Sequence, residues 1–274
     1  RVRHVCTWRR GRPRRYTRVS SSAASDAYKG QTNPCGEQPL PPYGACLLGS
    51  VNLARMVEDA FASDARLDVD RLAETVAVAI RFLDDVVDVS QYPLEAQRAE
   101  AMSKRRLGLG VTGLADALAM LGLVYGSGEA AEMAGNWMRV IQNSAYRASA
   151  NLAAEKGAFP LFDKDAYLKS PTVARLNKDV RLAVGTNGLR NSHVTSIAPT
   201  GTISLFADNV SSGIEPIFSL AYRRAVLMPD GSRREDAVTD HASRLYRAKA
   251  GEGPSPPPAS LPPPTPAPHA PGPA

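Results

Sequence analysis

Prolines are concentrated at the end of this chain, where eleven of the 24 residues from Gly251 to Ala274 are proline. Proline has a fixed φ and no backbone N–H, so a segment this rich in it cannot supply helices or central strands to a packed core. We therefore expect residues 251–274 to be disordered or extended as polyproline II. An SH3-like groove could bind such a segment, but a solvated tail is the simpler interpretation.

The first 30 residues are also atypical, because they are rich in arginine and then in serine and alanine. They hold eight arginines and one lysine against the single acid Asp26, which gives this leader a charge of +8. The whole chain carries +6, so the remaining residues together carry −2. An Arg-rich arm can bind nucleic acid, but this composition without periodicity is more typical of a disordered segment. We expect a disordered leader over 1–30 and a folded body over 31–250.

Composition limits the class of protein. With 43% hydrophobic residues in 274, the chain can build a sizeable core. It has no apolar run of about 18 residues, so no membrane span is expected. Its basic start is not followed by the apolar segment of a signal peptide. Three cysteines in this length are typical of free or catalytic thiols in a reducing compartment, and we take the cytoplasm as the default location.

Functional side chains gather between Asn33 and Cys46. Asn33, Cys35 and Glu37 alternate, so in an extended segment their amide, thiol and carboxylate would lie on one face. Pro34 favours an extended Asn33. Cys46 adds a second thiol eleven residues after Cys35. Such a face suits chemistry on a polyhydroxylated substrate.

Two other interpretations of this segment stay open. Most isolated intracellular cysteines are small buried hydrophobic residues, and an Asn-Pro pair is an ordinary turn signal. Zinc is disfavoured, because Cys35 and Cys46 have no Cys-x-x-Cys partner and no nearby histidine. We expect no metal site here.

A long amphipathic helix is predicted from about Val69 to Val89. Its apolar positions recur at helical spacing, at Leu72, Val76, Ile80, Leu83 and Val87. Asp84, Asp85 and Asp88 fall on the far side. Three acids near one helix end could bind a metal, but a solvated face is the better explanation.

Further local signals predict three more structured regions. Ser127 can cap a long helix that ends at Gly157, and Ser170-Pro171 can open a short one. Residues 193–198 are expected to form a buried strand with a structural His193. The segment 104–113 contains G-x-G-x-x-G, but no apolar strand precedes it and Glu132 falls inside a predicted helix, so we reject a dinucleotide site.

The segment from Pro199 to Ser204 is a candidate phosphate-binding loop. Gly201 allows close approach to a ligand, and two threonines and a serine supply hydroxyls. If a helix begins near Thr202, its first turn offers free backbone donors to a phosphate. The loop lacks the lysine of a P-loop, so it does not indicate an ATPase.

Two of these motifs resemble one enzyme family. Residues 32–53, which contain Asn-Pro-Cys-Gly-Glu and Cys46, are similar to the active-site finger loop of ribonucleotide reductases, especially the adenosylcobalamin-dependent class II enzymes. Residues 196–204, followed by Gly213-Ile214-Glu215-Pro216, resemble that family's substrate phosphate loop. The segment 104–113 is similar to an R-x-G-x-G-x-x-G turn of the family, leading into a helix capped by Thr112 and stopped at Gly122. The resemblance covers about residues 32–247, well under half of a full-length member.

The resemblance implies a fold and a reaction. The fold would be part of a ten-stranded α/β barrel with the finger loop at its centre. The reaction would convert ribonucleoside diphosphates to 2′-deoxyribonucleotides for DNA synthesis, with adenosylcobalamin as the radical source and a thioredoxin-like reductant. A homodimer is compatible with such a chain. The alternative is a class I large subunit, whose radical comes from a partner protein; the short interval between Cys35 and Cys46 favours class II.

The resemblance also assigns residue roles. Cys35 would carry the thiyl radical that removes the 3′-hydrogen, and Glu37 would take the 3′-hydroxyl proton. Asn33 would orient the ribose hydroxyls, and Cys46 would be one half of the dithiol that becomes a disulfide. The substrate phosphates would be held by Pro199, Thr200, Gly201, Thr202, Ile203 and Ser204.

The chain departs from the family pattern in its thiols. The second redox cysteine of the family lies far upstream, and the remaining Cys6 sits in the atypical leader, so the role is not transferred to it. The C-terminal cysteine pair of the family is also missing. We therefore expect this polypeptide alone to be inactive in turnover, as a fragment with a truncated or shifted reading frame. An inactive relic with a basic nucleic-acid-binding arm is the remaining alternative.

Overall fold

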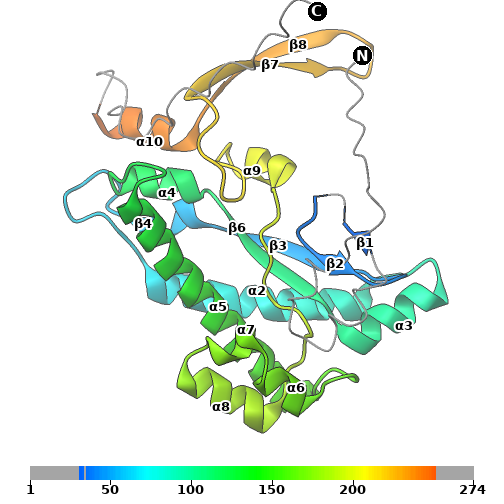
Figure 1. Ribbon diagram of the computed structural model, residues 1–274. Helices are drawn as coiled ribbons and strands as arrows, with labels where there is room; N and C mark the ends of the chain where they lie inside the picture. Colours follow the sequence, from blue (N-terminus) through cyan, green and yellow to red (C-terminus); the bar gives the residue numbers. More distant parts are fainter. Residues whose placement is uncertain (1–30, 34, 251–274) are drawn as a thin grey trace, which may run out of the picture. The chain divides into compact units, whose positions relative to one another are not determined.

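The structure is a computed structural model in which residues 31–33 and 35–250 are described (Figure 1). The predictions for the leader, for Cys6 and for the proline-rich tail therefore lie outside the described residues. Within them, the chain divides into two compact units. The first unit takes in residues 31–47, 81–107 and 146–194, and the second takes in residues 48–80, 108–145 and 195–250.

Two long helices account for much of the regular structure. Helix α2 spans Val69–Val89, as the periodicity predicts, and its five expected core positions are all buried. Helix α5 spans Gly128–Lys156, and the Ser127 hydroxyl accepts a hydrogen bond from Ala130 N at 3.1 Å. The predicted cap of α5 is therefore confirmed.

The first unit contains one short hairpin and a set of short helices. Strands β1 (Gln31–Thr32) and β2 (Pro39–Leu40) pair antiparallel. The C-terminal parts of α2 and α5 belong to this unit. Its short helices are α3 (Glu95–Lys104), α6 (Lys164–Leu168), α7 (Pro171–Ala174) and α8 (Lys178–Asn187). Helix α7 begins as predicted, because Ser170 accepts from Val173 N at 3.2 Å and Pro171 occupies its first turn.

The second unit holds the remaining sheets. Strand β3 (Leu47–Asn52) pairs with β6 (Leu107–Thr112), whose six residues are all buried. The other strand pairs are β4 (Val57–Glu58) with β5 (Arg66–Leu67), and β7 (Ala221–Leu227) with β8 (Arg233–Thr239). Its shorter helices are η2 (Leu53–Met56), α4 (Leu114–Met120), α9 (Gly201–Phe206) and α10 (His241–Ala250).

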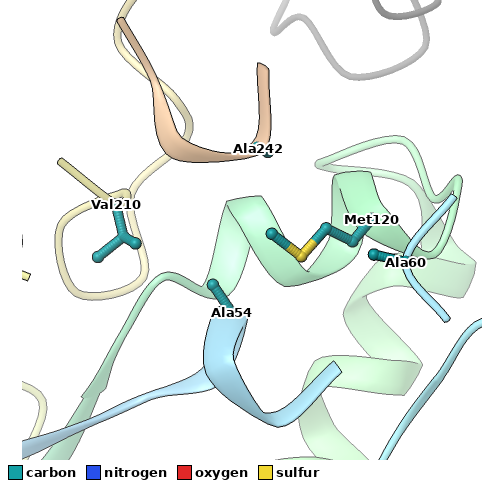
Figure 2. Packing of buried hydrophobic residues seen from close by; sticks show 5 residues of the cluster. All are labelled: Ala54, Ala60, Met120, Val210 and Ala242. Carbon is teal, nitrogen blue, oxygen red and sulfur yellow. The ribbon is translucent and has the colours of Figure 1, made fainter. Parts of the chain in front are cut away.

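A small hydrophobic cluster holds the helices of the second unit together (Figure 2). Helix α4 packs against both η2 and α10. The cluster joins residues far apart in sequence, namely Ala54, Ala60, Met120, Val210 and Ala242. Phe61 and Tyr246 add an edge-to-face ring contact, with centroids 5.2 Å apart. Small alanines allow the backbones to approach, and the flexible Met120 fills the space between them.

The expected mixed α/β class is confirmed, but the described residues form no closed barrel. Each sheet they contain has two strands. Residues 193–198, expected as a buried strand, make one isolated parallel bridge, between Thr195 and Leu109. That strand prediction is therefore wrong, because apolar residues alone do not supply a continuous ladder of backbone partners.

The glycine-rich segment also differs from expectation. It is strand β6 rather than a turn, and Gly113, with φ of 71°, occupies the cap of α4 that was assigned to Thr112. Gly122, with φ of 74°, follows the helix as predicted. This segment is closely packed: a Cβ on Gly110 would lie 2.3 Å from Ser196 O. No helix in the described part of the chain is long and apolar enough to cross a membrane.

Candidate functional site

The segment with the first thiol forms a tight hairpin loop in the first unit. Gly36 N donates to Asn33 O at 3.0 Å, and Asn33 N donates to Gln38 O at 3.2 Å. The Asn33 side chain also closes the loop, since its Oδ1 accepts from Gln38 N at 3.1 Å. Gly36, with φ of 77°, helps to reverse the chain. Cys35 is exposed at this turn.

This turn corrects the expectation of an extended segment with Asn33, Cys35 and Glu37 on one face. Asn33 uses its own amide oxygen to stabilise the reversal, which is the turn chemistry typical of asparagine. The three side chains still belong to one six-residue loop. Their catalytic roles are not decided by this geometry and stay predictions.

Cys46 is half-buried, and the charge of Glu37 in this loop acts on its thiol. Burial raises the pKa of the Cys46 thiol to about 12, Arg106 opposes that rise, and Glu37 adds to it. The thiol sulfur makes a weak contact with Leu47 O at 3.9 Å. The Glu37 carboxylate is therefore near enough to influence the Cys46 thiol, while the redox role of Cys46 stays a prediction.

A group of charged side chains surrounds Arg106. Arg106 Nη1 and Lys104 Nζ both donate to Glu100 Oε1, at 2.8 and 2.9 Å. Burial and the positive charges of Arg106 and Lys104 lower the pKa of His193 to about 4. Its Nδ1 lies 3.3 Å from Ser192 Oγ. His193 is therefore neutral near pH 7, in agreement with the structural role expected for it.

The three acids of α2 are held by cations. Asp84 is fully buried and bonds to Arg105 and Arg190, Asp88 bonds to Arg105, and Asp85 pairs with Lys156. The interpretation as a solvated face is wrong for Asp84. The three carboxylates lie close enough together to suggest a metal site, but their oxygens already receive hydrogen bonds from cationic side chains, so the arrangement is an ion-pair network.

The candidate phosphate loop lies in the second unit. Helix α9 begins at Gly201, and Ser204 N donates to Thr200 O at 2.8 Å. The N–H groups of residues 201–203 have no acceptor within the helix, as at any helix start. Gly201, Thr202 and Ile203 are exposed. A helix start near Thr202 was predicted, and the observed start agrees within one residue.

Two of the hydroxyls in this loop have structural partners. Thr200, with φ of 56°, accepts from Gly213 N at 2.7 Å and donates to Thr112 Oγ1 at 3.1 Å. Ser204 Oγ donates to Gly201 O at 3.0 Å. These bonds fix the loop, while Thr202 is exposed. Whether this loop and the Cys35 turn bind one substrate stays a prediction.

Sequence reasoning missed a buried acid pair in the second unit. Asp116 accepts from Ser211 N at 2.6 Å and from Ala242 N at 3.0 Å. Burial and the neighbouring Asp116 carboxylate raise the pKa of Asp240 to about 7. The two acids are far apart along the chain and no motif connects them. Arg106 was also missed, although a basic residue directly before an uncharged segment, residues 107–112, is a usable signal.

Comparison with protein families gives a match along most of the chain. The family model described as "Ribonucleotide reductase, barrel domain" matches residues 25–248. The chain belongs to the ribonucleotide reductase family. Its match lies in the barrel domain of that family, which agrees with the resemblance of the two motifs.

Curated relatives of this reductase domain include cobalamin-dependent enzymes. A "Vitamin B12-dependent ribonucleoside-diphosphate reductase" of Mycobacterium tuberculosis is 48% identical over 196 residues, covering 72% of this chain and 25% of the relative. One from Thermoplasma acidophilum is 44% identical, with 23% of it covered. A "Ribonucleoside-diphosphate reductase subunit alpha" of Chlamydia pneumoniae is 34% identical over 63% of this chain and 18% of the relative. The chain spans about a quarter of the length of the first two.

Proposed function

We propose that this reductase domain supplies the radical thiol, the base and a phosphate loop for reducing ribonucleoside diphosphates to 2′-deoxyribonucleotides. The observation that carries the proposal is the exposed Cys35 in the same turn as Glu37, an acid whose charge also raises the pKa of the Cys46 thiol. Identity of 48% to a vitamin B12-dependent ribonucleoside-diphosphate reductase supports the same substrate class.

Each side chain would act at a stated atom. The Cys35 sulfur would take the hydrogen from C3′ of the ribose, while Glu37 would accept the proton of the 3′-hydroxyl. The radical at C3′ would weaken the adjacent C2′–O bond, so that the 2′-hydroxyl leaves as water with a proton from one thiol of the dithiol. Cys35 would return its hydrogen to C3′ at the end. Cys46 and a second thiol would then supply two electrons and become a disulfide. Among the described residues the other thiol is Cys35 itself, so a separate thiol must come from outside them.

The phosphate loop would bind the charged end of the substrate. The first turn of α9 presents backbone N–H groups at Gly201, Thr202 and Ile203. The exposed Thr202 hydroxyl can add a hydrogen bond. Thr200 and Ser204 would act by holding the loop in shape, since their hydroxyls bond within it.

The position of Cys35 meets one requirement of adenosylcobalamin chemistry. Bound adenosylcobalamin supplies a radical by breaking its cobalt–carbon bond, and the thiol that receives the radical must be reachable. The exposed position of Cys35 meets that requirement. The two cobalamin-dependent relatives are also more similar to this chain than the Chlamydia pneumoniae subunit alpha is.

A hybrid enzyme tests the proposal. Residues 32–247 would replace the matching segment of the Mycobacterium tuberculosis relative, and deoxynucleotide formation would be measured with adenosylcobalamin and dithiothreitol. We expect turnover that falls by about 100-fold or more in Cys35→Ser and in Glu37→Gln. A hybrid that keeps its rate with Cys35→Ser would refute the thiol role. Turnover without added cobalamin would instead favour a class I mechanism.

A further inference from the structure

The guanidinium of Arg106 has donors that the fold does not use. Its side chain is 1% exposed, and Nη1 bonds to Glu100 Oε1 at 2.8 Å. Its Nε and Nη2 are buried without a hydrogen-bond partner among the described residues. A buried cation with unused donors is costly, so such a group needs an explanation in a folded protein.

The surroundings of Arg106 favour an anion. The Glu100 oxygen that binds Arg106 is shared with Lys104, whose Nζ lies 2.9 Å from it. One carboxylate therefore faces two cations. His193, the third basic group, is neutral near pH 7 because its pKa is lowered to about 4. Arg106, Lys104 and Glu100 together therefore carry one excess positive charge, and Glu37 is the acid on the side of Cys46.

Cys46 is the group beside Arg106 that can become an anion. Leu47 N donates to Arg106 O at 3.2 Å, so the residue that follows Cys46 lies directly opposite Arg106. Two charged side chains act on the thiol: Arg106 favours the thiolate, and Glu37 opposes it. Arg106 is thus placed to offset the effect of burial on Cys46.

We propose that Arg106 is a positioning residue for Cys46, and that its unused Nε and Nη2 donate hydrogen bonds to the thiolate formed when Cys46 releases its proton. A thiolate is also what Cys46 becomes when its disulfide is reduced again: the sulfur of an incoming thiolate bonds to the partner sulfur, and Cys46 leaves with the bonding electron pair. This inference rests on the proposed redox role of Cys46. It adds the group that stabilises the thiolate of this half-buried thiol against the effect of burial.

The test uses the full chain with Cys6→Ser and Cys35→Ser, so that Cys46 is the sole thiol. Alkylation rates are measured at about pH 8.5 with neutral iodoacetamide and with anionic iodoacetate, two reagents of similar size. A change in how easily the reagents reach the Cys46 sulfur alters both alkylation rates together. The ratio of the iodoacetate rate to the iodoacetamide rate therefore reports the positive charge near the sulfur.

We expect Arg106→Met to lower this ratio by about three- to tenfold, as for one charge at a few ångströms that water partly screens. The iodoacetamide rate should fall as well. Arg106→Lys should keep the ratio within about twofold, because it retains the charge. Arg81→Met is the matched control, since Arg81 pairs with Glu155 on the exposed surface of the same unit.

An unchanged ratio in folded Arg106→Met would overturn the inference, as would an equal loss in Arg81→Met. If Arg106→Met does not unfold cooperatively, Arg106→Gln gives the same comparison with a polar side chain in place. The measurement uses neither nucleotide nor cobalamin. A hybrid enzyme that fails to turn over while the ratio still depends on Arg106 would therefore count against the reductase proposal alone.

Discussion

Asp84 Oδ1 accepts a hydrogen bond from Arg105 Nε at 2.9 Å, in a pair that is almost completely excluded from water. Arg190 and Asn191 bond to the same carboxylate, at 3.3 and 2.8 Å. Asn191 also donates to Arg105 O at 3.2 Å. One buried acid therefore connects α2 to two other segments of the first unit.

Asp84→Ala should lower the free energy of unfolding by about 3–5 kcal/mol, because it removes the fully buried carboxylate bonded to Arg105 and leaves this cation with the half-exposed Asp88 alone. Asp85→Ala is the matched control. Its carboxylate pairs with Lys156 at an exposed position, so the loss should stay below about 1 kcal/mol. Urea denaturation measures both. Equal losses would show that burial of Asp84 adds nothing to the pair.

The apolar periodicity of α2 was readable from the sequence, whereas the role of Asp84 was not. Helical spacing identifies which residues face inward, and the five apolar positions of α2 are indeed buried. The partners of Asp84 lie 21, 106 and 107 residues away. A polar residue next to an apolar stripe looks solvated until such distant partners are known.

In the candidate site, too, some features could be predicted from the sequence and others could not. The presence of Asn33, Cys35 and Glu37 in one short segment was evident, and the helix start at Gly201 followed from a Gly-Thr loop. The turn at Cys35 was not predicted, because Asn33-Pro34 is compatible with both an extended chain and a reversal. Local sequence patterns could not predict which strands pair in a barrel either, because strand pairing depends on contacts between distant segments.

Gly110→Ala should destabilise the second unit by about 1–3 kcal/mol, because the new methyl group would meet the backbone of Ser196 at 2.3 Å. Gly135→Ala provides the opposite case. Gly135 is exposed on helix α5, with nothing within 4 Å of the new Cβ, so the change should stabilise by about 0.5–1 kcal/mol. Thermal unfolding of the two variants would contradict this account if both shifted in the same direction.

Asp240→Asn should change how stability depends on pH. The pKa of Asp240 is raised from 3.8 to about 7, so the folded chain holds this proton more tightly than the unfolded chain does. The resulting stabilisation is complete below pH 3.8 and is lost as the pH rises to about 7. Asparagine stays neutral and avoids that loss.

We therefore expect Asp240→Asn to exceed the parent chain in stability at about pH 8 by about 1–3 kcal/mol, with little difference near pH 4. Unfolding in urea at a series of pH values measures this. Exposed Asp64→Asn is the control and should follow the parent at each pH. A parallel shift of Asp240→Asn at all pH values would show that ionisation of this acid is not the cause.

Thr200→Ala should cost about 1–3 kcal/mol, because Gly213 N would lose the hydroxyl that accepts its hydrogen bond. Thr200→Ser keeps that acceptor and should stay close to the parent chain. Thr202→Ala should leave stability unchanged but weaken binding of a ribonucleoside diphosphate by about two- to tenfold. Calorimetric titration measures the binding. Unaltered affinity in Thr202→Ala would remove this hydroxyl from the proposed phosphate contacts.

The two thiols of the first unit should differ widely in reactivity. Cys35 is exposed, whereas burial raises the pKa of the half-buried Cys46 to about 12. Because the thiolate is the reactive form, iodoacetamide at about pH 8 should alkylate Cys35 at least about 100-fold faster than Cys46. Mass spectrometry of peptides after timed quenching gives both rates from one sample. In urea the difference should disappear, since unfolding removes the desolvation of Cys46. If it persisted there, local sequence rather than burial would control the reactivity of Cys46.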